Sequence, residues 1–159
     1  MSESTLTQQH LAMTDCFVFL ISFVFLAIYI LFLISLKKTM QNVPIEKRIF
    51  PNWFIWMQLI PMLGIVFSWL MLPFGIPHGL RNTVSENKAA TDSAGMLKMI
   101  GLFITVCLSI NLFFHISHMI YQTASRASYF ANSIVAVLAF IFFIIYWIKI
   151  FSFRKKYFK

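Results

Sequence analysis

The residues most able to do chemistry lie in one apolar stretch, where Cys107, Asn111, His115 and His118 follow one another at intervals of four, four and three positions. In an α-helix these intervals place the four side chains on one stripe about 80° wide. Imidazole binds copper, zinc and iron, and His115 and His118 are one turn apart, so the pair is a candidate metal or haem site. Two histidines without a third ligand are a weak signature of such a site.

The alternative interpretation of this stripe is a contact between helices. Polar side chains in membrane bundles bond to neighbouring helices or reach the headgroups, at about 1 kcal/mol each. We therefore expect a packing surface and no bound cofactor. Gly101 and Thr105, four positions apart near the start of the same stretch, also indicate close packing. A metal site would need further ligands, for which His10, Asp15 and Cys16 are candidates if they lie on the same side of the membrane.

Several kinds of chemistry are disfavoured by the positions of the acidic residues. The five carboxylate side chains all lie outside the apolar stretches, at Glu3, Asp15, Glu46, Glu86 and Asp92. Proton relays and cation-coupled transport usually need an acid at mid-membrane, and hydrolases need an acid–base pair. The sequence also lacks a Gly-rich phosphate loop, a serine nucleophile elbow and a CxxC pair. We predict that the protein is not an enzyme.

The elements that position these residues are membrane helices. Of 159 residues, 60% are hydrophobic and only 11% are charged, which is far from the composition of a soluble domain. Spans need about 20 apolar residues, and backbone groups in lipid must bond within helices, so we predict an all-α integral membrane protein. A single domain over 1–159 contains hydrophobic segments at about 16–36, 50–77, 99–121 and 130–151, a polar N-terminal tail 1–15, a polar loop 78–98 and a basic tail 152–159.

The second segment is interrupted. From Ile49 to Leu80 there is no charged residue, yet four of the five prolines fall there. Proline removes a backbone donor and clashes with the preceding turn, so the helix is expected to break at Pro61–Gly64. The segment is then either a kinked span or a re-entrant hairpin. Tryptophan is typical of membrane interfaces, and a lysine stem can lie in hydrocarbon, so the candidate interface anchors are Trp53, Trp56, Trp69, Trp147 and Lys149.

The basic residues discriminate between these two topologies. If the second segment crosses, the 13 Lys and Arg residues divide into eight on one side and five on the other, which is a weak bias. If it is re-entrant, twelve lie on one side and Arg126 alone on the other. The positive-inside bias then places the linker 37–48, the loop 78–98 and the C-terminus in the cytoplasm. Kinked spans are the commoner structure, so both topologies stay open. Cations at segment ends fit anionic headgroups and require no nucleic acid.

Residues 44–159 resemble a family of small, uncharacterised bacterial inner-membrane proteins. The resemblance is carried by Pro44-Ile45-Glu46-Lys47-Arg48, by Pro51 through Trp56 to Ile60-Pro61, and by Ile145-Tyr146-Trp147-Ile148-Lys149-Ile150. The first stretch has one more residue between proline and glutamate than the family's Pro-Glu-x-Arg turn. The resemblance implies a helical protein of the bacterial cytoplasmic membrane and no assigned reaction.

These observations favour a non-enzymatic function. The expected protein is an accessory, scaffold or assembly subunit that contacts the lipid bilayer and packs against itself or other membrane subunits. One alternative is a small channel or transporter in which the broken helix lines a pathway. A second is a metal- or haem-binding membrane protein that uses His115 and His118.

Single-cysteine labelling from the outside tests the re-entrant topology on a background that lacks Cys16 and Cys107. We expect labelling at Ser4 and Ser125 and none at Ser85 or Ser152, because juxtamembrane Lys and Arg resist translocation. If positions 41 and 85 instead lie on opposite sides of the membrane, the second segment is a kinked span.

Overall fold

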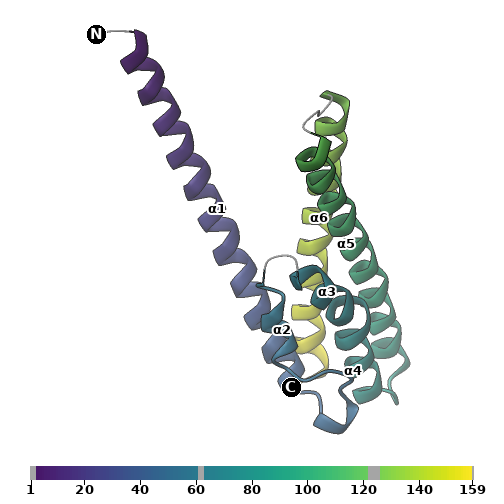
Figure 1. Ribbon diagram of the computed structural model, residues 1–159. Helices are drawn as coiled ribbons and strands as arrows, with labels where there is room; N and C mark the ends of the chain where they lie inside the picture. The colour runs from purple at the N-terminus through teal and green to yellow at the C-terminus, as the bar shows by residue number, and fades with distance from the viewer. Residues whose placement is uncertain (1–2, 61–62, 122–125, 159) are drawn as a thin grey trace. The chain divides into compact units, whose positions relative to one another are not determined.

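The computed structural model describes residues 3–60, 63–121 and 126–158, and the regular structure in these residues is helical (Figure 1). Four helical stretches are long and apolar enough to cross a membrane, namely Phe19–Gln41, Leu63–Thr83, Lys88–Ile120 and Ala127–Tyr157. The predicted all-α membrane fold is confirmed. The elements are α1 (Glu3–Gln41), η1 (Ile45–Lys47), α2 (Phe54–Met57), α3 (Leu63–Leu70), η2 (Met71–Gly75), α4 (Ile76–Thr83), α5 (Lys88–Tyr121) and α6 (Arg126–Tyr157).

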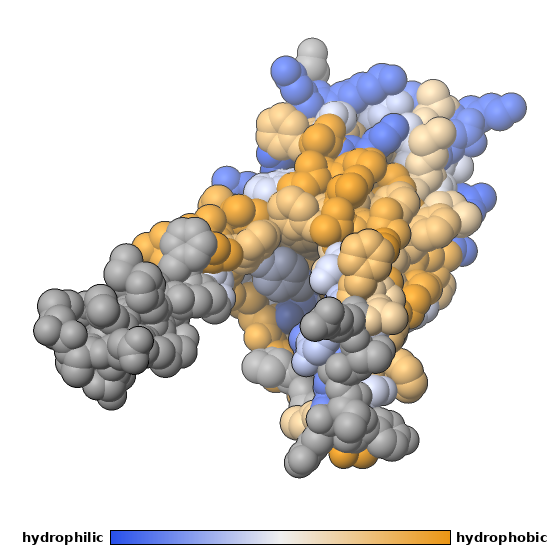
Figure 2. Space-filling model, turned by 90° about the horizontal axis from the view of Figure 1, so that it is seen from above, coloured by the Kyte–Doolittle hydropathy of each residue, from blue (hydrophilic) through white to orange (hydrophobic). Residues whose placement is uncertain are grey.

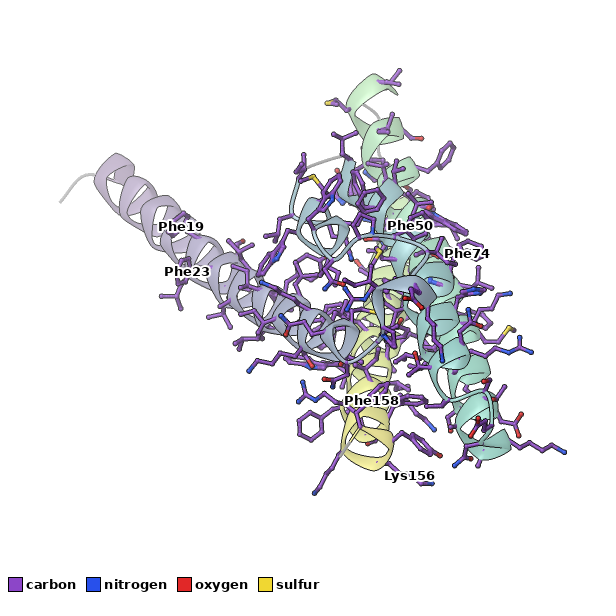
Figure 3. The ribbon with its side chains drawn as sticks, turned by 90° about the horizontal axis from the view of Figure 1, so that it is seen from below. Phe19, Phe23, Phe50, Phe74, Lys156 and Phe158 are labelled. Atoms are coloured by element: carbon purple, nitrogen blue, oxygen red, sulfur yellow. The ribbon has the colours of Figure 1, made fainter. Side chains whose placement is uncertain are left out.

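The chain divides into two compact units, Met1–Ile34 and Ser35–Lys159. The first unit is the greater part of α1, a continuous helix. Its described side chains include Phe19, 74% exposed, and Phe23, 65% exposed, both labelled in Figure 3. Large exposed apolar side chains on a helix of this length suit direct contact with lipid.

Several helices extend further than the apolar segments predict. The polar tail 1–15 is helical from Glu3, and most of the expected loop 78–98 belongs to α4 and α5, leaving only residues 84–87 between them. Polar residues continue a helix into water once it has begun, and Asn87 gives α5 a sharp start. The Asn87 Oδ1 accepts a hydrogen bond from the Ala90 N–H at 3.2 Å, the geometry of an N-cap.

Helices α5 and α6 form a long antiparallel pair (Figure 1). The rings of Phe103 and Phe142 stack between them with centroids 5.2 Å apart, and Ile104 and Ala139 are buried. The outer faces stay apolar. Figure 2, seen from the end where α5 ends and α6 begins, shows mostly hydrophobic side chains on this unit, with hydrophilic ones mainly along one edge of the view.

Residues 49–83 fold back on themselves, and we call them the hairpin. The Phe54 ring packs edge-on against Phe67 at 5.2 Å, and Gln58 bonds to Ser68, so the chain before the turn runs antiparallel to α3. A Cβ on Gly75 would lie 3.0 Å from the Phe50 ring, which places the start of the hairpin beside η2. The expected break is therefore a reversal of direction.

Both ends of the hairpin lie at one end of the Ser35–Lys159 unit, which we call the linker end. A Cβ on Gly79 of α4 would lie 3.3 Å from Met40 and 3.4 Å from Val43, residues that precede the hairpin. The end of α6 lies there too (Figure 1), and one cavity is lined by Leu97 of α5 and Phe153 of α6. The chain therefore enters and leaves the hairpin at the same end of this unit. Whether the hairpin is re-entrant in a membrane stays a prediction.

A second interruption, which the sequence did not predict, lies within the returning limb at η2. Pro73 and Pro77 have no N–H to donate to the carbonyls four residues earlier, so a regular α-helix cannot run through them. The chain widens there into a π-helical turn in which the Ile76 N–H donates to the Met71 carbonyl. Met71, Leu72, Pro73 and Gly75 are all buried.

The π-helical turn packs against the backbone of α5 at Gly101. A Cβ at this position would lie 2.6 Å from the Leu72 carbonyl oxygen and 2.9 Å from the Pro73 nitrogen. Real Cβ atoms do not approach backbone so closely, and backbone has no rotamer with which to move away. Glycine is therefore required by the spacing of the two segments, as the Gly101–Thr105 pattern predicts.

Adding one methyl group at Gly101 tests this contact. Gly101→Ala is expected to lower the free energy of unfolding by about 1–3 kcal/mol, because the clash pushes the hairpin away from α5. Gly95→Ala is the matched control, since nothing lies within 4 Å of an added Cβ on the same helix. It should be neutral or stabilising by up to about 1 kcal/mol. The measurement is SDS titration in mixed micelles followed by circular dichroism, and equal midpoints for the two variants would contradict the contact.

Candidate functional site

The contact between the hairpin and α6 centres on the carbonyl of Leu72. The donor four residues later, Ile76, is already bonded to Met71, and the donor five residues later would be Pro77, which has no N–H. The Tyr146 hydroxyl of α6 donates to this carbonyl at 2.8 Å, and the Tyr146 side chain is fully buried. In a water-free interior an unpaired carbonyl costs several kcal/mol. Tyr146 therefore satisfies a group that the two prolines leave without a helical donor.

A row of hydroxyl groups on α5 faces α3, the first helix of the same returning limb. Thr105 is fully buried and donates to the Gly101 carbonyl at 3.0 Å, and Ser109 donates to the Thr105 carbonyl at 2.9 Å. The Ser109 oxygen then accepts a hydrogen bond from the Trp69 indole N–H at 2.9 Å. Trp69, a sequence-based candidate for an interface anchor, thus bonds inside the bundle. The sequence signal for this position of Trp69 is the four-residue spacing of Thr105 and Ser109, which places two hydroxyl groups on one face of α5.

The turn of the hairpin is closed by a second glycine contact. Gly64 is buried, and a Cβ on it would collide with the Gln58 carbonyl oxygen. Ser68, one turn further along, donates to the Gln58 Oε1 at 3.3 Å. Pro61, the other half of the predicted break, lies outside the described residues. Gly64 is therefore needed for packing, because any side chain there would separate α3 from Gln58.

The polar stripe of α5 lies partly toward α6. The Asn111 amide donates to the Cys107 carbonyl at 3.3 Å within its own helix, while His118 forms a hydrogen bond with Ser128 of α6. The His118 ring also lies 4.8 Å from that of Tyr129. His115 is exposed, so the two histidines do not share one buried environment.

The described residues contain no group of three His, Cys, Asp or Glu side chains that could hold a metal ion. The side chains of His10, Asp15 and Cys16, the further candidate ligands, lie outside those that the structure describes. Cys107 is a free thiol. Within the described residues, His115 and His118 therefore have no third ligand.

The remaining candidate anchors occupy different surroundings. Trp53 is 53% exposed, whereas Trp56 is half-buried and lies under the Lys37 ammonium, 5.7 Å from the ring centroid. Trp147 packs against Phe143 with ring centroids 6.2 Å apart, and Lys149 is exposed one turn before the basic end of α6. Trp53 and Lys149 are thus free to reach headgroups, while Trp56 also fixes the start of the hairpin to the end of α1.

The fold and this set of contacts define a multi-pass helical membrane protein that carries a returning hairpin. Comparison of the chain with protein-family models, with curated proteins and with solved structures gives no match. The resemblance of residues 44–159 to small bacterial inner-membrane proteins stays an expectation.

Removing the Tyr146 hydroxyl tests its role at Leu72. Tyr146→Phe keeps the ring and is expected to cost about 1–3 kcal/mol of unfolding free energy, because the Leu72 carbonyl loses its donor. Tyr129→Phe on the same helix is the control, since Tyr129 is 57% exposed. Both are measured by SDS titration in mixed micelles. A wild-type midpoint for Tyr146→Phe would show that the hydrogen bond does not hold the hairpin.

Proposed function

We propose that this protein is a non-enzymatic accessory, scaffold or assembly subunit of a membrane complex. The observation that carries the proposal is the one-sided support of the hairpin. Its inner side is fixed to α5 and α6 through Gly101, Ser109 and Tyr146. On its other side, apolar residues at and after the turn are exposed, and these are Leu59, Ile60, Leu63 and Val66.

A turn at membrane depth must be covered by protein. Irregular backbone is tolerated within the hydrocarbon region only when it is buried in protein or lines water, because each unsatisfied backbone group costs several kcal/mol. The residues around the turn are apolar, with Leu63 53% and Val66 54% exposed, so they do not suit a water-filled cavity. A second copy of the chain or another membrane subunit fits this surface.

The rival functions gain less support from the contacts. A channel or transporter would use the broken helix ends to line a pathway. Here Gly64 of α3 lies directly against the backbone of Gln58, and Gly101 of α5 lies directly against the backbone of η2. Metal or haem binding needs more ligands than His115 and His118. Catalysis needs acid–base groups, and the described carboxylates Glu46, Glu86 and Asp92 all lie at the linker end, outside the uncharged runs Ile49–Leu80 and 99–125.

We propose further that the linker end faces the cytoplasm of a bacterial cell, with the protein in the inner membrane. Of the 13 Lys and Arg residues, eleven lie in described segments that meet there, including the C-terminal run Arg154-Lys155-Lys156. Basic residues next to spans are retained on the cytoplasmic side. This orientation supports a subunit whose cationic end meets anionic lipid and whose hairpin meets a partner within the bilayer.

Photo-crosslinking in intact membranes tests the proposed partner surface. A photoreactive amino acid at Val66 is expected to form adducts with protein, either at twice the mass of the chain or at the summed mass of the chain and a partner subunit. The matched control is Val137 on α6, 59% exposed, where adducts with lipid are expected. Lipid adducts alone at both positions, together with a monomeric particle in mild detergent, would overturn the proposal.

A further inference from the structure

A cavity of about 120 Å³ opens at the linker end between the hairpin and α5. It is formed where η2 and α4 pass the first turns of α5, and it is open to the surface. Its lining includes Phe74, Pro77, His78, Arg81, Gly95 and Lys98. Figure 3 looks at this end of the molecule, with Phe74 labelled beside α5.

The cavity carries positive charge only. Arg81 and Lys98 contribute two cationic side chains and His78 an imidazole ring, and the lining holds no carboxylate. The Lys98 ammonium lies 5.9 Å from the centre of the Phe74 ring, which holds the charge over the cavity by a cation–π contact. The His78 ring is bonded to the Asn82 amide at 2.7 Å, which fixes its orientation. Two cations converging on one hollow provide a site for an anion.

The position of the cavity marks it as a site at headgroup level. Lys98 is the last charged residue before the uncharged run that begins at Met99, and Arg81 is the first after the uncharged run that ends at Leu80. The two cations therefore mark the boundary of the apolar layer on two adjacent helices. Anionic phospholipids present their phosphate groups at this depth, and basic pockets between membrane helices bind such headgroups.

Space for the anion comes from Gly95, and space for acyl chains from the surface next to it. An added Cβ on Gly95 would meet nothing within 4 Å. Met99 and Phe103 follow on the same face of α5, four and eight residues on, and are 57% and 52% exposed. The apolar strip leads from the cavity into the membrane. A free phosphate ion would use the cations but not this strip.

We propose that this cavity binds the phosphate group of an anionic phospholipid, with Arg81 and Lys98 holding the phosphate and the strip Met99–Phe103 contacting an acyl chain. The site is independent of the partner surface at the hairpin turn, because it lies at the opposite end of α3–α4. It provides a specific lipid contact at the point where the hairpin leaves the membrane.

Native mass spectrometry of the full chain tests the proposal with two lipids of matched chain length, phosphatidylglycerol and phosphatidylcholine. Wild type is expected to retain one phosphatidylglycerol adduct in preference to phosphatidylcholine. Each cation near the surface is worth about fivefold in affinity, so Arg81→Gln with Lys98→Gln should weaken the adduct about 30-fold. Gly95→Leu should abolish it at unchanged charge by filling the cavity. The charge-matched control, Lys38→Gln with Lys47→Gln, removes two exposed cations at the same end and should keep the adduct.

Inorganic phosphate at millimolar concentration separates the two possible sources of the phosphate group. Little displacement of the lipid is expected, because the ion gains nothing from the apolar strip. Retention of the adduct by Gly95→Leu, or equal weakening in the control pair, would overturn the proposal. If phosphate displaces the adduct and the two lipids bind equally well, the ligand of the cavity is a free anion and not a lipid. Circular dichroism of each variant verifies that the helices are intact.

Discussion

The fold of the C-terminal unit depends on the contact between two backbones, at Gly101 of α5 and at the Leu72–Pro73 peptide of the hairpin. Water in a soluble protein would satisfy a helix that two prolines interrupt. Within the apolar layer the protein must supply the missing partners itself. The close approach at Gly101 brings η2 into the bundle, and there the Tyr146 hydroxyl reaches the Leu72 carbonyl. The absence of a side chain at Gly101 and the hydroxyl group of Tyr146 thus make the irregular segment η2 compatible with a membrane.

The hairpin and the α5–α6 pair contribute different properties. The pair is regular, and its aromatic contacts and apolar outer faces need only lipid around them. The hairpin is irregular and is held through hydrogen bonds such as that from Trp69 to Ser109. A regular scaffold with one irregular insertion is how functional surfaces are commonly built, because strain and exposed groups are concentrated where a partner can meet them.

The sequence predicted the apolar spans and the interruption of the second one, because hydropathy and proline act locally. It also indicated close packing at Gly101 and Thr105. It did not predict η2, although Pro73 and Pro77 were visible, because the width of a helical turn depends on what packs beside it. Tyr146 was noticed only within a motif beside Lys149, and its acceptor is 74 residues away in the chain. The helices extend beyond the predicted hydrophobic segments, because composition marks the edge of the membrane and not the end of a helix.

The order of synthesis has a consequence for the hairpin. Residues 49–83 leave the ribosome before α5 and α6 exist, so neither Gly101 nor Tyr146 is present when the hairpin first meets the membrane. Until then the Leu72 carbonyl lacks its donor, and burying it in lipid is unfavourable. The Leu72 carbonyl therefore gains its donor only after Tyr146 of α6 has been made. The second hydrophobic segment thus depends for its last hydrogen bond on the last one.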